Sequence, residues 1–401
     1  MKKISILYLI DYMRTMGGAE RNLLHILTHI DRKQFRISLY SFQFGPPITR
    51  LLEQKNIKFV QIHYPTTLQG LLKYFALARE IRHQKINILH SFFEGSDIWG
   101  TLLAKLAAIP VVVSSKRDLG FSKNKKILMA YRLINPFVAK FISVSEAVKH
   151  QVHRQEKVNL EKIITIYNGV DINKFHKTNH KDVIKNELKL NAKSSIVGVL
   201  ANIRPIKGLE YFIYAASKVV KEFPQTQFIV IGICIPGQEN VIYYNKLKSL
   251  VQELKLENKF FFLGGRSDIP EILSIMDVSV LPSLSEGFSN TVIESMAAGN
   301  PLVVTDVGGN SEAVVHGKTG FVVPSKDSDK LAEAISILLY NQKLAKTMGE
   351  AGRKRAEQIF SIETMIDKIE NLYISILNNK NYTMKNIASQ IEDAPFLGSI
   401  D

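Results

Sequence analysis

Residues 278–294 read VSVLPSLSEGFSNTVIE, and this stretch decides the fold prediction because it joins a strand pattern directly to a helix pattern. The apolar run Val278 to Leu281 is typical of a buried strand, and Pro282 ends it. The helical pattern that follows extends to about Ala298 and stops at Gly299, a residue type that commonly ends helices. A buried strand that leads through a short loop into a helix is the repeating unit of α/β proteins.

The same alternation extends in both directions from this junction. In the first half we expect a helix at 22–30 and strands at Ile4 to Ile10, Ile37 to Phe42, Ile86 to Leu89, Val111 to Val113, Phe141 to Val144 and Ile163 to Ile166. In the second half we expect helices at 209–222 and 329–341, and further strands at Ile196 to Ala201, Phe228 to Gly232, Phe260 to Leu263, Leu302 to Thr305 and Phe321 to Val323. Strands that alternate with helices predict parallel sheets covered on both faces.

The length of 401 residues predicts two domains, because a single hydrophobic core stops growing at roughly 250 to 300 residues. A polar interruption between the two sets of strands marks the boundary. We expect a first domain at 1–171, a linker at 172–191, a second domain at 192–361, a helix at 362–378 that packs back on the first domain, and a tail at 379–401. Two such sheets in tandem predict a cleft, with ligands beyond the carboxyl ends of the strands.

The cysteine content and the apolar runs indicate a cytoplasmic protein. Cys234 is the only cysteine, so an intrachain disulfide is excluded and a reducing compartment is favoured. No stretch approaches the roughly 18 to 20 apolar residues that span a bilayer. Lys2 and Lys3 precede the apolar run Ile4 to Ile10, but that run stops at Asp11 without a cleavage site, so a buried first strand explains it better than a signal peptide.

The positive charge is concentrated in the first half of the chain. Residues 1–170 contain 26 Lys and Arg against 11 Asp and Glu, whereas residues 171–401 contain 26 of each. Such a one-sided field attracts nucleic acid, phosphorylated substrates or acidic lipid headgroups; the alternative is a basic surface that only aids solubility. The stretch Lys116 to Arg132 mixes lysines with apolar residues, which fits either an amphipathic surface for anionic lipid or a plain solvated face.

The loop and first helical turn after Pro282 carry the residues best suited to chemistry. A helix start presents free N–H groups and a positive dipole end to an anion, and Gly287 lets the backbone approach a ligand closely. Carboxylates such as Glu286 and Glu294 accept hydrogen bonds from sugar and ribose hydroxyls. Local evidence leaves two alternatives open: Thr291 to Glu294 fits a capping box without a ligand, and Glu286 fits an exposed loop residue without function.

Both carboxylates belong to a longer stretch, residues 282–309, that resembles glycosyltransferase family 4, whose members are retaining enzymes that use nucleotide sugars. Other landmarks of this family occur in the same order: Gly17 to Arg21 (GGAER), His90, Asn168 to Asp171 (NGVD), Arg204-Pro205 and Lys207-Gly208. The resemblance covers nearly the whole chain and is weakest after Asn378. It implies the GT-B fold, an α/β architecture in which two Rossmann-like domains face each other across a cleft. The first domain would hold the acceptor and the second the nucleotide sugar.

The resemblance also implies roles in donor binding. Arg204 and Lys207 would pair with the donor diphosphate, and Glu294 would bind the ribose hydroxyls. Backbone groups that line the sugar and phosphates would come from Gly287, Phe288, Ser289, Asn290 and Thr291, with a second backbone surface at Gly17 and Gly18. Arg266 and its neighbours in Gly264 to Asp268 would lie near the nucleobase.

Two residues are expected to be catalytic by the same resemblance. Glu286 would contact the transferred sugar, and His90, after an early strand, would face the cleft near that sugar. The alternative for His90 is a structural role, which is more common for a lone histidine. This chain has Phe92 where many relatives have a second histidine, so the acceptor contacts of those relatives are not carried over to it.

The sequence therefore predicts a retaining glycosyltransferase that moves a hexose-type sugar from a UDP- or GDP-linked donor to a saccharide or lipid-linked acceptor. The family implies bacterial cell-surface polysaccharide biosynthesis and no obligatory cofactor or metal. The lone cysteine favours a cytoplasmic enzyme, and its basic first domain would suit an anionic membrane surface, with a plain solvated face as the alternative. The segment Asp327 to Asp329 resembles the metal-binding acidic pair of other glycosyltransferases. It begins a predicted helix, however, where acidic side chains stabilise the dipole.

Three alternatives remain at this point. A sugar-nucleotide epimerase has the same architecture and needs no acceptor. A dehydrogenase would need a Gly-x-Gly-x-x-Gly turn after the first strand, which the sequence lacks. A nucleic-acid-binding protein would use the basic half, but no known binding module matches, so no nucleic acid partner is expected.

Overall fold

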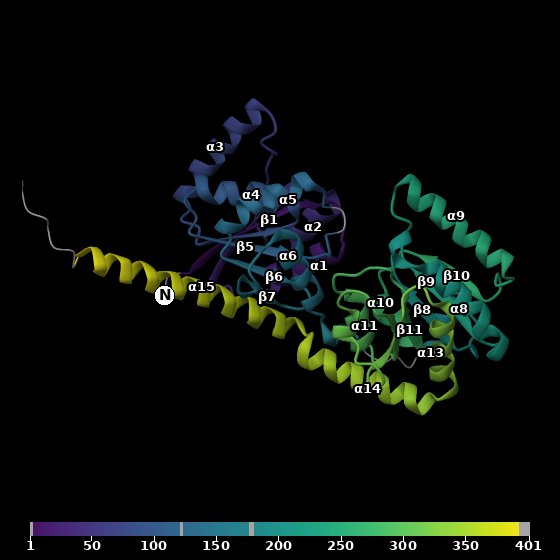
Figure 1. The fold of residues 1–401 in the computed structure, drawn as a ribbon. Coiled ribbons are helices and arrows are strands. Elements are labelled where there is room, and N and C mark those ends of the chain that lie inside the picture. Colours follow the sequence, from purple (N-terminus) through teal and green to yellow (C-terminus); the bar gives the residue numbers. More distant parts are fainter. Residues whose placement is uncertain (1–2, 121–122, 176–179, 393–401) are drawn as a thin grey trace, which may run out of the picture.

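The computed structural model describes residues 3–120, 123–175 and 180–392, with side chains described as far as residue 378. Figure 1 shows two α/β lobes, the first in purple and blue and the second in teal and green. The yellow helix α15 (Ile362–Glu392) leaves the second lobe and extends along the first. The fold predicted from the sequence, two parallel-sheet domains, is confirmed.

The described part of the first domain contains a seven-stranded parallel sheet in the order β3-β2-β1-β4-β5-β6-β7. Its strands are β1 (Ile4–Met13), β2 (Phe35–Phe44), β3 (Phe59–Gln61), β4 (Ile88–Phe92), β5 (Val111–Lys116), β6 (Lys140–Ser143) and β7 (Ile163–Thr165). The connecting helices are α1 (Gly18–His29), α2 (Pro46–Gln54), α3 (Leu68–His83), α4 (Glu94–Leu106), α5 (Lys125–Ile134) and α6 (Glu146–Glu156). The strand order reverses between β1 and β4, so the loops into α1 and α4 diverge there and leave room for a ligand.

The described part of the second domain contains a six-stranded parallel sheet in the order β10-β9-β8-β11-β12-β13. Its strands are β8 (Ile196–Leu200), β9 (Gln227–Ile231), β10 (Phe260–Gly264), β11 (Val278–Leu281), β12 (Leu302–Thr305) and β13 (Gly320–Val323). The helices are α7 (Lys181–Glu187), α8 (Leu209–Glu222), α9 (Gln238–Glu253), α10 (Ile269–Ile275), α11 (Asn290–Ala297), α12 (Asn310–Ala313), α13 (Ser328–Tyr340) and α14 (Gln342–Ile359). Here the order reverses between β8 and β11, which places the loops that begin at 201 and 282 side by side.

The central strands are buried on both faces, which explains their continuous apolar runs. Side chains from Ile6 to Ile10 in β1 are completely inaccessible, as are Val278 in β11 and Val303 in β12. A buried parallel strand has no polar face, so its sequence does not alternate. This is why short apolar runs located most of the strands correctly.

The chain crosses between the domains twice, and the two crossings are paired. Val170 N donates to Phe360 O at 2.8 Å, and Ile362 N donates to Val170 O at 3.2 Å. Beside them the rings of Tyr167, Phe288 and Phe360 pack together, with centroids 5.0 to 5.4 Å apart. The domain contact therefore has an apolar centre as well as a continuous backbone connection.

Helix α15 packs on the first domain through Met365, Ile366, Ile369, Leu372 and Tyr373, which are buried in the same cluster as the side chains of β1. The Tyr373 hydroxyl lies 3.1 Å from that of Tyr8. The expectation of a loose tail from Asn378 is wrong over 379–392, because the helix continues to Glu392. The remainder of the expected tail, 393–401, lies outside the described residues.

Candidate active site

Residues 282–289 form a tight loop between β11 and α11 at the carboxyl edge of the second sheet. Ser289 caps α11 in an extended conformation, and the helix begins at Asn290. A Cβ built on Gly287 would lie 2.4 Å from the Arg117 carbonyl oxygen of the first domain. Glycine is therefore required where the two domains touch, and the free N–H groups of α11 point toward their junction.

Glu294 is bound by a side chain from the other domain. Arg21 Nη1 lies 2.5 Å from Glu294 Oε1, and the carboxylate side chain is only 9% exposed against 41% for Arg21. Burial raises the pKa of Glu294, and the charge of Arg21 acts in the opposite direction. The capping-box alternative is wrong: Thr291 lies inside the helix rather than at its cap, and its hydroxyl contacts that of Ser289 at 2.9 Å.

Glu286 is held by two groups on one of its oxygens. Lys207 Nζ approaches Glu286 Oε1 at 2.5 Å and Ser283 Oγ donates to the same atom at 2.7 Å. Lys207 ends a short 3-10 turn, Pro205–Lys207, that follows β8. Leu284 N donates to Ile206 O at 2.8 Å and so fixes this turn against the 282–289 loop. The alternative of an exposed, unengaged Glu286 is therefore wrong.

Arg204 precedes the same turn and is exposed. Within residues 3–120, 123–175 and 180–378 its side chain makes no hydrogen bond or ion pair, while its backbone carbonyl accepts from Lys207 N at 2.9 Å. Its guanidinium is thus a cation without a protein partner, one residue before the turn that carries Lys207. Such a pair of cations beside a helix start suits an anionic ligand.

The first domain reaches the same place through backbone and amide groups. Gly17 caps α1 and Gly18 is its first residue, so these glycines open a helix rather than lie in a free loop. Asn290 Nδ2 donates to Gly18 O at 3.2 Å, and Asn168 Nδ2 donates to Asn290 Oδ1 at 2.6 Å. The structure therefore brings Gly17, Gly18, Asn290 and Glu294 together from both domains.

The expected orientation of His90 is wrong. Its side chain lies within β4 and is completely buried. Nδ1 contacts the Tyr373 hydroxyl at 2.6 Å and Nε2 contacts Ser115 Oγ at 2.8 Å. Burial, with a smaller contribution from Arg117, lowers the pKa of His90 to about 3, so the ring is neutral. His90 links β4, β5 and α15 and does not face the domain junction.

Arg266 lies beyond the carboxyl end of β10, at the edge of the second sheet. It forms a bidentate pair with Asp268, at 2.8 and 2.7 Å, which lowers the pKa of that carboxyl group. No contact among the described residues joins Arg266 to Glu286, Glu294 or Lys207. Its planar guanidinium is therefore held in place by a neighbour in the same loop.

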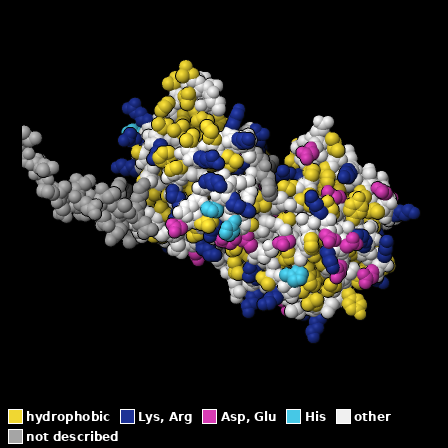
Figure 2. Space-filling view, in the orientation of Figure 1, with side chains coloured by type: hydrophobic (Ala, Val, Ile, Leu, Met, Phe, Trp, Pro, Cys, Tyr) yellow, Lys and Arg dark blue, Asp and Glu magenta, His cyan; other side chains and the backbone are white. Residues whose placement is uncertain are grey.

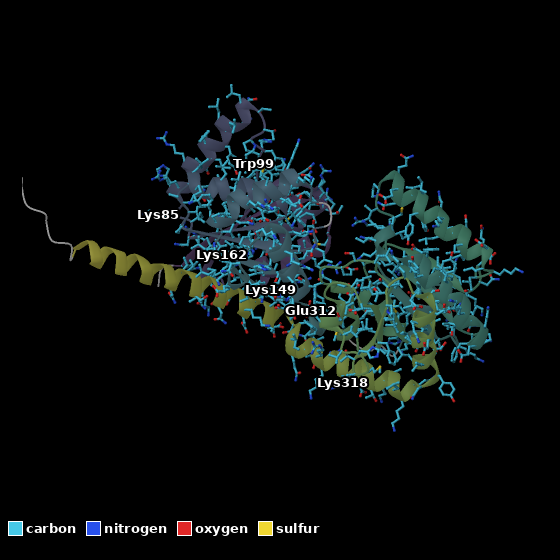
Figure 3. All side chains as sticks on the ribbon, viewed as in Figure 1. Lys85, Trp99, Lys149, Lys162, Glu312 and Lys318 are labelled. Atoms are coloured by element: carbon cyan, nitrogen blue, oxygen red, sulfur yellow. The ribbon has the colours of Figure 1, made fainter. Side chains whose placement is uncertain are left out.

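Several groups at the junction were not assigned a role from the sequence. Glu312, labelled in Figure 3 between the two lobes, accepts from Glu146 N at 2.7 Å and Ala147 N at 2.8 Å. A second-domain carboxylate thus caps α6 of the first domain. Arg117 Nη2 donates to Asn168 Oδ1 at 2.8 Å, which supports the amide bound to Asn290. Of these residues, only Asn168 was noted in the sequence, as part of a family motif. The contacts of the others could not be predicted, because the residues that they bind are distant in sequence.

The described residues hold no cluster of three or more His, Cys, Asp or Glu that would suit a metal ion. The acidic segment at Asp327 has a local purpose instead. Asp327 Oδ1 accepts from Lys330 N at 2.9 Å and caps α13, and Asp329 pairs with Lys218 at 2.6 Å. None of the helices in the described part of the chain is long and apolar enough to cross a membrane.

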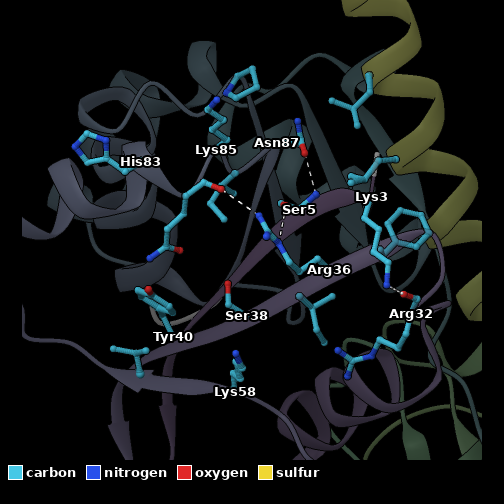
Figure 4. A pocket seen from close by; sticks show the side chains of 18 of the residues that line it. Lys3, Ser5, Arg32, Arg36, Ser38, Tyr40, Lys58, His83, Lys85 and Asn87 are labelled. Carbon is cyan, nitrogen blue, oxygen red and sulfur yellow. Dashed lines mark hydrogen bonds between the residues drawn. The ribbon is translucent and has the colours of Figure 1, made fainter. Parts of the chain in front are cut away.

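A hollow on the first domain, shown in Figure 4, is lined by residues other than those of this junction. It measures about 1820 Å³ and its lining includes basic residues at the amino ends of β1, β2 and β4: Lys3, Arg32, Arg36, Lys58, His83 and Lys85. Ligands of α/β sheets bind at the opposite edge. The junction, with its paired carboxylates and cations, is therefore the better candidate site.

Two family models match adjoining parts of the chain. The model described as Glycosyltransferase Family 4 matches residues 16–174, and the one described as Glycosyl transferases group 1 matches residues 180–355. The UDP-Gal:alpha-D-GlcNAc-diphosphoundecaprenol alpha-1,3-galactosyltransferase of Escherichia coli is 28% identical over 390 residues, which cover 94% of this chain and 98% of that protein. A Campylobacter jejuni enzyme, the N,N'-diacetylbacillosaminyl-diphospho-undecaprenol alpha-1,3-N-acetylgalactosaminyltransferase, is 28% identical over 324 residues, 77% of this chain and 82% of that protein.

Solved structures agree with these matches. The crystal structure of HepE from Anabaena in complex with UDP has a TM-score of 0.84 and 25% sequence identity, and covers 93% of this chain and 100% of that chain. Its complex with UDP-glucose has a TM-score of 0.82. WaaG, a glycosyltransferase involved in lipopolysaccharide biosynthesis, has a TM-score of 0.68 at 15% identity and shares the fold. The architecture, the junction and the two matched models agree, and the chain belongs to the family 4 glycosyltransferases, with the GT-B fold.

Proposed function

We propose that this glycosyltransferase moves a hexose-type sugar from a UDP-sugar to a lipid-linked or saccharide acceptor, with retention of the anomeric configuration. The observation that carries the proposal is the placement of two engaged carboxylates, Glu286 and Glu294, around the start of α11. A UDP-linked donor is favoured over a GDP-linked one by the UDP complexes of HepE and by the UDP-Gal donor in the name of the Escherichia coli relative. The names of both relatives also favour an undecaprenyl diphosphate acceptor and, with it, cell-surface polysaccharide assembly.

The donor would fit the second domain from its diphosphate outward. Arg204, Lys207 and the free N–H groups of α11 form one positive surface at the switch point of the sheet, where the diphosphate would lie. Glu294 would accept the ribose hydroxyls, which requires that it share or release Arg21. Arg266 would contact the base at the edge of the site. These cations take the part that a metal ion has in other transferases, so no metal is required.

The chemistry would be a front-face departure. As the bond from the anomeric carbon to the diphosphate oxygen breaks, negative charge grows on the diphosphate and positive charge on the sugar. Arg204, Lys207 and the start of α11 would stabilise the negative charge on the diphosphate, and Glu286 would orient the sugar hydroxyls. The departing oxygen would take the proton of the acceptor hydroxyl, which attacks the same face. His90 has no part in this step because its ring is buried and fully engaged.

The first domain would receive the acceptor at the cytoplasmic surface of a membrane. Its concentration of Lys and Arg favours contact with anionic lipid, and a lipid-linked acceptor would be presented there. A nucleic acid partner is not proposed, since the family match accounts for the basic half.

Incubation with UDP-, GDP- and ADP-sugars, each with and without a lipid-linked or saccharide acceptor, tests the proposal. We expect nucleotide release that depends on both a UDP-sugar and an acceptor, and a product whose anomeric proton coupling matches that of the donor. A changed sugar nucleotide without any acceptor would establish the epimerase alternative. Inverted product would refute retention, and no reaction with any UDP-sugar would refute the choice of donor.

A further inference from the structure

Helix α3 is apolar on two faces, only one of which is buried. Tyr74, Ala78 and Ile81 point into the first domain. On the other face Leu68, Leu71, Leu72 and Phe75 are 77%, 38%, 65% and 54% exposed. These four recur at i, i+3, i+4 and i+7 and therefore form one continuous stripe along the helix. We call them the α3 stripe; its exposure has no explanation in the packing of the domain.

The α3 stripe stands at a projecting point of the molecule. Figure 1 shows α3 rising away from the body of the first lobe, and the space-filling view shows hydrophobic side chains gathered on that projection (Figure 2). Helix α3 packs on α4 and α4 packs on α5, where Met129 and Leu133 are each 67% exposed. Contiguous exposed apolar patches on a soluble protein mark interaction sites.

The charges around the stripe select the kind of partner. The exposed cations of α3, α4 and α5 are Lys73, Arg79, Arg82, Lys105, Lys125, Lys126 and Arg132. Among the described residues of these helices, Glu80 is the one fully exposed carboxylate. Lys105 Nζ lies 3.9 Å over the ring of Phe137, itself half exposed, so a cation covers an apolar group at the surface. Exposed apolar side chains with exposed cations on the same and neighbouring helices match the acyl and headgroup layers of an anionic bilayer.

A second copy of the chain fits this surface poorly. Two such faces brought together would set the same cations against one another with few carboxylates to offset them, and like charges in contact oppose association. The charge distribution therefore favours lipid over self-association.

The stripe begins at the edge of the sheet that carries the candidate site. Tyr64, just before α3, stacks on Phe42 near the carboxyl end of β2, with ring centroids 3.7 Å apart. Its hydroxyl lies beside the first turn of α4, 3.0 Å from where a Cβ on Gly95 would be. A surface bound to the stripe would therefore meet the first domain at the edge where Gly17 and Gly18 open α1.

We propose that the α3 stripe inserts among the acyl chains of an anionic membrane while the cations of α3, α4 and α5 contact its headgroups. The inference rests on the proposed function in one respect: a lipid-linked acceptor would be delivered to the carboxyl edge of the first sheet. Insertion of the stripe would assign the membrane contact to one helix, α3, whereas the overall basic charge of the domain assigns it to no particular element.

Co-sedimentation of the full chain with vesicles tests this directly. Vesicles of phosphatidylcholine with about a third phosphatidylglycerol are compared with vesicles of phosphatidylcholine alone. The triple variant Leu68→Ser, Leu72→Ser, Phe75→Ser should lower partition into the anionic vesicles by at least about tenfold. The matched control is Val241→Ser, Ile242→Ser, Tyr340→Ser, which removes equally exposed apolar side chains from the second domain and should leave partition unchanged.

A second measurement locates the insertion. Phe75→Trp should show a blue-shifted emission on anionic vesicles and quenching by lipids brominated on the acyl chain, beyond any change seen for the wild type, whose tryptophan is Trp99. Unchanged partition of the triple variant, or an emission that does not respond, would overturn the proposal. A wild-type dimer that the triple variant converts to a monomer would also overturn it, in favour of a second copy on the stripe.

Failure of this proposal is distinguishable from failure of the proposed function. Transfer to a water-soluble acceptor in the absence of vesicles should be the same in the triple variant and the wild type. If vesicle binding is lost and soluble transfer persists, the stripe is a membrane element of a working enzyme. If soluble transfer is absent in both proteins, the proposed donor or acceptor is wrong, and the vesicle result still decides the role of the stripe.

Discussion

Replacement of Arg21 by alanine tests how the two domains share the candidate site. Arg21 lies on α1 of the first domain and Glu294 on α11 of the second, 2.5 Å apart. The variant removes the cation and leaves a carboxylate that is 9% exposed without its partner. The substitution therefore affects both the stability of the folded chain and the availability of Glu294 to a ligand.

The expected loss of stability for Arg21→Ala lies between the loss typical of an exposed ion pair and the loss typical of a buried one. Exposed ion pairs contribute about 0 to 1 kcal/mol, whereas removal of one partner of a buried pair costs about 3 to 5 kcal/mol. Glu294 is buried but Arg21 is partly solvated, which screens their attraction. We expect the free energy of unfolding to fall by about 1 to 3 kcal/mol at pH 8.

The loss should shrink at lower pH. Burial already raises the pKa of Glu294, and removal of Arg21 takes away an opposing influence, so the pKa of the variant is higher still. The folded variant then binds a proton more tightly than the unfolded chain, and its stability rises as the pH falls through that raised pKa. The deficit relative to wild type should therefore be largest at pH 8 and smaller near pH 5.

Urea unfolding at the two pH values measures the deficit. Lys330→Ala serves as the control, because Lys330 and Glu333 form an exposed pair of similar length, 2.7 Å, within one helix. It should leave the free energy of unfolding almost unchanged at either pH. A deficit for Arg21→Ala that matches this control, or that does not depend on pH, would refute the reasoning that Glu294 is a buried charge held by Arg21.

Three further substitutions test the role of Glu286, the close contact between the domains at Gly287, and the structural role of His90. Glu286→Gln should lower the turnover number about 100-fold or more while the Kd for UDP, measured by calorimetry, changes less than about threefold, because UDP lacks the sugar that Glu286 is proposed to contact; an equal loss of both would contradict this role. Gly287→Ala should destabilise the chain in thermal unfolding by about 1 to 3 kcal/mol, since the new Cβ would lie 2.4 Å from the Arg117 carbonyl oxygen, whereas Gly317→Ala meets no neighbouring atom and costs only its backbone strain. His90→Phe should lower stability by about 1 to 3 kcal/mol through the lost contacts to Tyr373 and Ser115 and leave the pH profile of the turnover number unchanged; an altered profile would restore a catalytic role.

The sequence was sufficient for the elements that are buried on both sides. Helix α8 and strands β11 and β12 have the predicted bounds, because continuous apolar runs and helical periodicity report burial directly. Strand β3 was not predicted since its three residues, Phe59 to Gln61, are half-buried or exposed. The family motif located both carboxylates but not their partners.

The errors have a common physical origin. A strand buried on both faces gives no sign of which way a polar residue points, so His90 could not be assigned to the core or to the cleft. The partner of Glu294 is 273 positions away in the chain, and no local pattern reports such a contact. The capping box failed for a related reason: the N-cap is Ser289 rather than Thr291, and a shift of two residues at a helix boundary is beyond the resolution of a sequence pattern.

The paired crossings at Val170 and Ser361 determine how the two domains can move. A single covalent connection would let one domain swivel about any axis, whereas two adjacent segments tied by backbone hydrogen bonds resist twisting and sliding. Gly169 adds to this restraint, since a Cβ there would lie 2.8 Å from the Ile362 Cα. A hinge about the paired segments is the movement that these restraints oppose least. Rotation about it would separate Arg21 from Glu294 and Gly18 from Asn290 together, so the first domain would complete the candidate site in a single movement or leave it open.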